Sequence, residues 1–131
     1  MIYVCELRIP ANTLETAPAR SSYPITAGAI TKFALHWPWG AGNLAGVRAL
    51  HNEFQYWPLS VSAWFNSTRR DLDFAEQHLV TSDDASIELE GYNLDDTFAH
   101  TVTVYIEVTR PSGQGADVGL WASLGGEPIY G

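Results

Sequence analysis

The chain has 131 residues, of which 46% are hydrophobic and 17% are charged, and it carries a net charge of −8. This length corresponds to one domain that can bury roughly two thirds of its unfolded surface. The acidic charge and the single lysine, Lys32, argue against binding to nucleic acid or to anionic lipids. No run approaches the ~18 apolar residues of a membrane span, so we expect no membrane contact.

Alternating residues predict a first strand over residues 3–9. Cys5 is the only cysteine and lies on the apolar face of that strand, so we expect a buried thiol and no intrachain disulfide. Residues 11–24 contain two prolines and predict a long connection or an extended arm. Residues 25–37 predict a longer strand whose core-facing side includes Phe33, Leu35 and Trp37, with a bulge or bend at Gly28.

The middle of the chain predicts short strands separated by turns. We expect a turn over residues 38–43, and strands over residues 44–50 and 54–57. Residues 59–65 fit either a strand edge or an apolar loop. A brief strand is expected over residues 72–74, and residues 75–80 are the one stretch in which a short helix is plausible.

The clearest strands come last, over residues 86–92 and 98–109, where apolar and polar residues alternate. About eight strands at this spacing predict an all-β, antiparallel β-sandwich over residues 1–110. A jelly roll is the preferred form of this sandwich, because the Cys…Trp…Cys pattern of an immunoglobulin domain is missing.

Residues 111–131 follow the last strand without regular periodicity but remain rich in apolar side chains. Disordered segments are typically poor in such residues, so we expect this segment to be a C-terminal arm that buries itself against a neighbouring subunit. The side chains expected at that interface are Leu120, Trp121, Leu124, Ile129 and Tyr130.

No catalytic or cofactor motif is recognisable, and we expect neither enzymatic activity nor a cofactor. The four histidines form no metal-binding motif. The acidic pairs Asp83-Asp84 and Asp95-Asp96 raise the alternative of a calcium site, but acidic residues are also typical of turns. Turn formation is the favoured interpretation of these pairs.

The aromatic residues suggest a second functional hypothesis. Some of them are expected in the core, but any that are exposed could stack on sugar rings or anchor a protein partner. The candidates for such a carbohydrate- or receptor-binding site are Trp39, Tyr56, Trp57 and Trp64.

Several segments resemble small virion-associated proteins of phages and environmental viruses: residues 30–33, 42–48, 55–58, 91–93 and 100–104. The resemblance implies a β-sandwich capsid, decoration or tail-associated protein that forms a homo-oligomer, contacts other virion proteins and supplies no catalytic residues. It places the protein in the virion after synthesis in the host cytoplasm, because residues 1–8 lack the pattern of a signal peptide.

Overall fold

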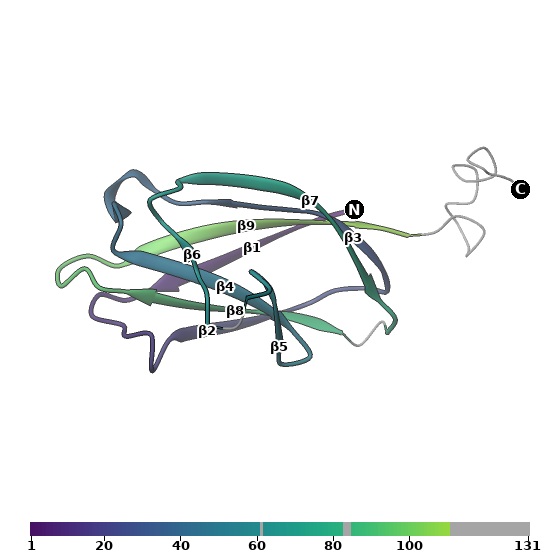
Figure 1. The fold of residues 1–131 in the computed structure, drawn as a ribbon, viewed down its shortest axis with the longest axis horizontal. Helices are drawn as coiled ribbons and strands as arrows, with labels where there is room; N and C mark the ends of the chain where they lie inside the picture. The colour runs from purple at the N-terminus through teal and green to yellow at the C-terminus, as the bar shows by residue number, and fades with distance from the viewer. Residues whose placement is uncertain (61, 83–84, 111–131) are drawn as a thin grey trace, which may run out of the picture.

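The computed structural model describes residues 1–60, 62–82 and 85–110, which form two antiparallel β-sheets packed face to face (Figure 1). The predicted all-β, antiparallel sandwich is confirmed. Sheet A has the strand order β1 (Ile2–Ile9), β9 (His100–Thr109), β3 (Gly28–His36), β7 (Asp71–Val80). Sheet B has the order β2 (Ala19–Pro24), β8 (Ser86–Asn93), β4 (Ala45–His51), β5 (Phe54–Trp57), and the short β6 (Phe65–Asn66) also pairs with β4.

The core lies between the sheets and is built by strands that alternate as the sequence predicts. In β9, the four inward-facing apolar side chains Val102, Val104, Ile106 and Val108 are fully buried. Aromatic rings join the sheets, because Phe33 of β3 stacks on Trp57 of β5 with 5.4 Å between ring centroids. Cys5 is buried as expected, and burial raises the pKa of its thiol to about 11.

The helix considered for residues 75–80 is wrong, because these residues complete strand β7. This ten-residue strand pairs with β3 along its length, from Gly28 opposite Val80 to His36 opposite Asp71. Its inward positions include Glu76 and His78. Because these inward side chains are polar, the alternation of apolar and polar residues that identifies a strand is absent from this part of the sequence.

The connection predicted over residues 11–24 is also partly wrong, because residues 19–24 form β2. Arg20 lies opposite Glu90 of β8, and Tyr23 lies opposite Ile87. Gly28 adopts a φ of 151°, and a side chain there would meet the Thr109 carbonyl oxygen at 2.9 Å. The bulge itself lies two residues further on, between Ile30 and Lys32.

Four loops gather at one end of the sandwich, and the chain leaves β9 at the other (Figure 1). The four loops are residues 10–18, 37–44, 67–70 and 94–99, which join β1 to β2, β3 to β4, β6 to β7 and β8 to β9. The loop over residues 37–44 contains a short 3-10 helix, η1 (Trp39–Ala41). We call this end of the molecule the loop end.

Candidate functional site

The loop end exposes large apolar side chains from three of its four loops. Trp39 is 82% exposed, and Phe98 is 65% exposed. The full set of exposed large apolar residues on these loops is Leu14, Trp39, Leu44, Leu94 and Phe98. Exposed apolar residues grouped in this way are typical of surfaces that bind a partner.

Hydrogen bonds between the loops hold this surface in place. The buried side chain of Asn93 donates to the carbonyl oxygens of Ile9, at 3.1 Å, and Phe98, at 2.9 Å. The backbones of Asn93 and Thr13 exchange two hydrogen bonds of 2.8 Å, and the Leu94 amide donates to the Leu44 carbonyl at 2.8 Å. The apolar side chains are therefore carried on a fixed framework.

Trp39 is the most exposed large apolar residue described, and a neighbouring cation orients its ring. The guanidinium carbon of Arg70 lies 3.4 Å from the centroid of the Trp39 ring, which is a cation–π contact. Tryptophan and arginine are the residue types most enriched among the energetically important side chains of protein interfaces. This pair is therefore suited to anchor a partner.

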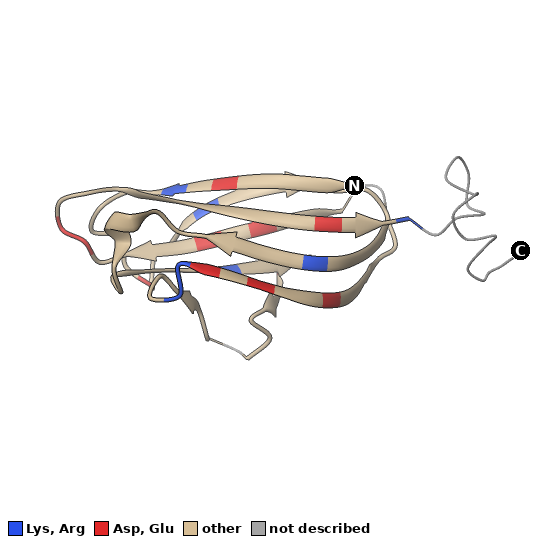
Figure 2. Cartoon of the chain, turned by 90° about the horizontal axis from the view of Figure 1, so that it is seen from above, with Lys and Arg blue, Asp and Glu red and all other residues tan. Residues whose placement is uncertain are grey.

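The loop over residues 94–99 forms an acidic tip of the molecule (Figure 2), and its acidic side chains make hydrogen bonds within the loop. Asp95 accepts hydrogen bonds from the backbone amides of Thr97 and Phe98, and its other oxygen lies 2.9 Å from His100 Nε2. These bonds lower the pKa of Asp95, the Thr97 amide having the largest effect. Asp95 therefore has the turn-forming role favoured by the sequence.

The outer face of sheet A carries a second apolar surface, which we call the sheet A patch. It consists of Ile2 and Val4 on β1 and Tyr105 on β9, and all three are exposed. Val4 lies directly opposite Tyr105 in the β1–β9 pair. Because β1 is an edge strand of sheet A, the patch reaches the border of the sheet.

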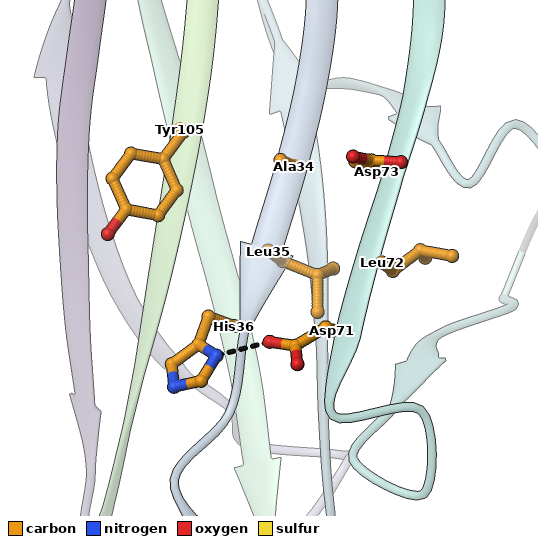
Figure 3. Close-up of a pocket in the computed structure, with 7 residues that line it drawn as sticks. All are labelled: Ala34, Leu35, His36, Asp71, Leu72, Asp73 and Tyr105. Atoms are coloured by element: carbon orange, nitrogen blue, oxygen red, sulfur yellow. Dashed lines mark hydrogen bonds and ion pairs between the residues drawn. The ribbon is translucent and has the colours of Figure 1, made fainter.

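A shallow groove runs beside this patch (Figure 3). Its floor is the small side chain of Ala34 on β3, which lies between Tyr105 of β9 and Asp73 of β7. One part of the groove has a volume of about 480 Å³ and ends at His36 and Asp71. The other part, of about 270 Å³, shares Ala34, Asp73 and Tyr105 and runs toward β1.

His36 and Asp71 form a hydrogen-bonded pair at one end of the groove (Figure 3). This hydrogen bond is the main reason why the pKa of Asp71 lies below its ordinary value. The groove thus combines one aromatic side chain with fixed polar groups, an arrangement typical of small-molecule sites.

The outer face of sheet B, by contrast, is covered by its own chain. The ring of Trp64 packs edge-on against Tyr92 at 5.0 Å, and the Arg48 guanidinium lies 4.2 Å from the Trp64 ring centroid. Beneath this cover, the buried carboxylate of Glu90 pairs with Arg20 and with Arg48, the latter at 2.7 Å. Among the described residues the two outer faces therefore differ: Ile2, Val4 and Tyr105 are exposed on sheet A, whereas Trp64 and Arg48 cover the middle of sheet B.

A pair of histidines lies between β4 and β7. His51 Nδ1 and His78 Nε2 are 2.7 Å apart, and Tyr56 packs on His78 with 4.3 Å between ring centroids. Burial lowers the pKa of both histidines, and the charge of His51 lowers that of His78 further. Across residues 1–60, 62–82 and 85–110, no group of three or more His, Cys, Asp or Glu residues is placed to hold a metal ion.

The four aromatic residues proposed for ligand binding lie in different places. Trp57 is 1% exposed and stacks in the core, so it is one of the aromatic residues expected there and offers no free ring to a ligand. Trp64 covers sheet B, Tyr56 packs on the histidine pair, and Trp39 alone is exposed at the loop end. Tyr105 is not singled out by the sequence, because its position on the polar face of a regular alternation is the only signal of its exposure.

The five interface residues predicted in the C-terminal arm, Leu120, Trp121, Leu124, Ile129 and Tyr130, lie outside the described residues, as do Asp83 and Asp84. Within the described part of the chain, no helix is long and apolar enough to cross a membrane. Comparisons with protein-family models, with curated proteins and with solved structures found no match to this chain.

Proposed function

We propose that this protein is a non-enzymatic structural subunit that assembles with copies of itself, as a capsid, decoration or tail-associated protein of a virion does. The observation that carries the proposal is the presence of two separate apolar surfaces, the loop end and the sheet A patch, on one small domain. Exposed apolar patches on soluble proteins commonly mark sites of interaction with a partner. Two different patches suit a subunit with more than one neighbour.

The strand order supports a finer assignment of the fold as a jelly roll. Strands β1, β9, β3 and β7 in one sheet face β2, β8, β4 and β5 in the other, so the chain crosses between the sheets at most of its connections. Two Greek keys wound together in eight strands give such an alternation, and the jelly roll is common in viral capsid proteins and in lectins. The fold is thus compatible with a role in a virion.

Solution mass tests the assembly. Native mass spectrometry and sedimentation over a range of concentrations should give a defined oligomer for the full chain. Replacing Ile2 and Val4 with threonine, which keeps a high strand propensity, should weaken it. Replacing Leu79, an exposed residue of β7 outside both surfaces, with threonine is the matched control and should leave the mass unchanged. A full chain that is monomeric at all concentrations would refute the proposal.

The location in a virion needs a separate measurement. Particles purified on a density gradient from the source of this sequence should contain peptides of this chain in a fixed ratio to the major particle proteins. If peptides of this chain are found only in the gradient fractions that contain no particles, the chain is not a virion protein, even if it forms an oligomer.

Carbohydrate binding is a second candidate, and the sheet A groove favours it. Its volume of about 480 Å³ falls within the usual range of small-ligand sites, roughly 300–1,000 Å³. Tyr105 could stack on a sugar ring, while His36, Asp71 and Asp73 could bond to its hydroxyl groups. Glycan-array binding that is lost in Tyr105→Ser but kept in Leu79→Ser would support this role. Absence of binding to any glycan would exclude it.

A further inference from the structure

The loop end presents an apolar surface that no described part of the same chain covers. Trp39 and Phe98 are its most exposed members; hydrogen bonds of Asn93 hold the loop that carries Phe98, and Arg70 lies over the ring of Trp39. A surface that is apolar and already ordered gives up little conformational entropy when a partner binds.

The chain leaves the sandwich far from this surface. Strand β9 begins at His100, beside the loop end, and runs for ten residues to Thr109 at the opposite end (Figure 1). At about 3.3 Å per residue, the nine steps from His100 to Thr109 place the two ends of β9 about 30 Å apart. Whatever follows Arg110 therefore starts a full sandwich length away from the loop end of its own copy.

The 21 residues after Arg110 have the composition of a partner for an apolar surface. They include six large apolar residues and only two charged ones, Asp117 and Glu127. The six apolar residues are Val118, Leu120, Trp121, Leu124, Ile129 and Tyr130. Fully extended, a segment of this length spans up to about 70 Å, so it can cross from one subunit to another.

The geometry points to head-to-tail assembly: we propose that residues 111–131 of one copy dock on the loop end of the next copy. This inference rests on the proposed self-assembly and names its contact. To return to its own loop end, the segment would have to cross about 30 Å along the sandwich, which takes about nine fully extended residues and leaves Val118 short of that surface. A second copy whose loop end faces this exit can receive all six apolar residues.

Such a contact joins two different surfaces of the subunit. It is therefore heterologous, and repetition of it gives a closed ring or an open filament, depending on the rotation between neighbours. Trp39, held by Arg70, is the expected anchor on the receiving copy. The sheet A patch remains free for contacts between rings, between filaments or with other proteins.

Two full-length variants test the contact. The head variant carries Trp39→Ser and Phe98→Ser, and the tail variant carries Trp121→Ser and Leu124→Ser. Each variant alone should lose the head-to-tail contact, so native mass spectrometry should give an oligomer of lower mass than that of the unaltered protein. Mixed together, they should form a one-to-one heterodimer and stop there, because the mixture retains one intact tail and one intact head. A variant with Leu59→Ser and Leu79→Ser, which replaces exposed leucines elsewhere, is the matched control.

A labelled peptide of residues 111–131 gives a direct readout. Its fluorescence anisotropy should rise on titration with the tail variant, and Trp39→Ser in that variant should weaken binding at least about tenfold, as expected for a central anchor. Circular dichroism of each variant confirms that the sandwich is intact.

The outcomes separate the two proposals. A full chain that is always monomeric refutes the self-assembly on which this inference rests. An oligomer whose mass is unchanged in both variants leaves self-assembly standing and overturns the head-to-tail contact. A mixture that yields no heterodimer, or a peptide that does not bind, also overturns it.

Discussion

Replacing Asn93 with alanine should both destabilise the protein and loosen the loop end. The fully buried Asn93 side chain makes three hydrogen bonds: to the Ile9 carbonyl at 3.1 Å, to the Phe98 carbonyl at 2.9 Å, and from the Asp95 amide at 3.0 Å. A typical buried hydrogen bond contributes about 1 kcal/mol net to stability, so the three bonds correspond to about 3 kcal/mol. For a domain of this size, that loss lowers the Tm by roughly 10–20 °C.

Urea unfolding monitored by tryptophan fluorescence measures this loss, with differential scanning fluorimetry as a second readout. Asn43→Ala is the matched control, because Asn43 is an exposed asparagine of the same end. Its side chain makes no hydrogen bond to another described residue, so the expected change is within ±0.5 kcal/mol. A loss of less than about 1 kcal/mol in Asn93→Ala would refute the view that Asn93 ties the loops together.

The histidine pair predicts that stability falls as the solution is acidified. Because burial lowers the pKa of His51 and His78 from 6.5 in the folded chain, the unfolded chain binds more protons, and stability is present above about pH 6.5 and lost below it. His78→Gln should flatten the fall in Tm between pH 7.5 and 5. Gly46→Ala should cost about 1–3 kcal/mol in urea unfolding, because the new methyl carbon would lie 2.3 Å from the Tyr92 ring. The Cys5 thiol should react with a thiol reagent only after denaturation, because it is buried and its pKa is raised to about 11.

The control for the histidine pair is His36→Gln, which alters an exposed histidine and should leave the fall in Tm between pH 7.5 and 5 as steep as in the unaltered protein. A fall in Tm as shallow as that of His78→Gln would argue against the buried pair as its source. Gly40→Ala places a carbon at 3.5 Å from His100, an ordinary contact, so it should be the milder glycine variant. Rapid labelling of Cys5 in the native protein would contradict its burial.

The sandwich could be predicted because its central strands follow a simple alternation. Val102 to Val108 face the core at every second position, and burial on one face selects such a pattern. The strands that escaped prediction lie at the edges. Strand β7 carries Glu76 and His78 on its inner side, where they bond to neighbours across the sandwich, and β2 consists mostly of polar residues that pair with β8.

The candidate surfaces were harder to predict, because exposure depends on residues distant in sequence. Trp39 and Trp57 both lie among other aromatic residues and prolines, yet one is exposed and the other is buried against Phe33 of another strand. The exposed apolar residues 14, 39, 44, 94 and 98 belong to loops far apart in the sequence, and only the strand order places these loops at the same end of the sandwich. The groove of sheet A likewise needs the register that sets Ala34 between Tyr105 and Asp73.

The covered face of sheet B makes the two sides of the molecule different from each other. The amide of Gln55 bonds to the carbonyls of Pro58, Ser60 and Ala63, which fastens the segment carrying Trp64 over that face. An oligomer built through sheet A and the loop end would turn this fastened face toward the surrounding water. It is therefore the side of the molecule on which a fluorophore or a foreign epitope could be displayed without disturbing its neighbours.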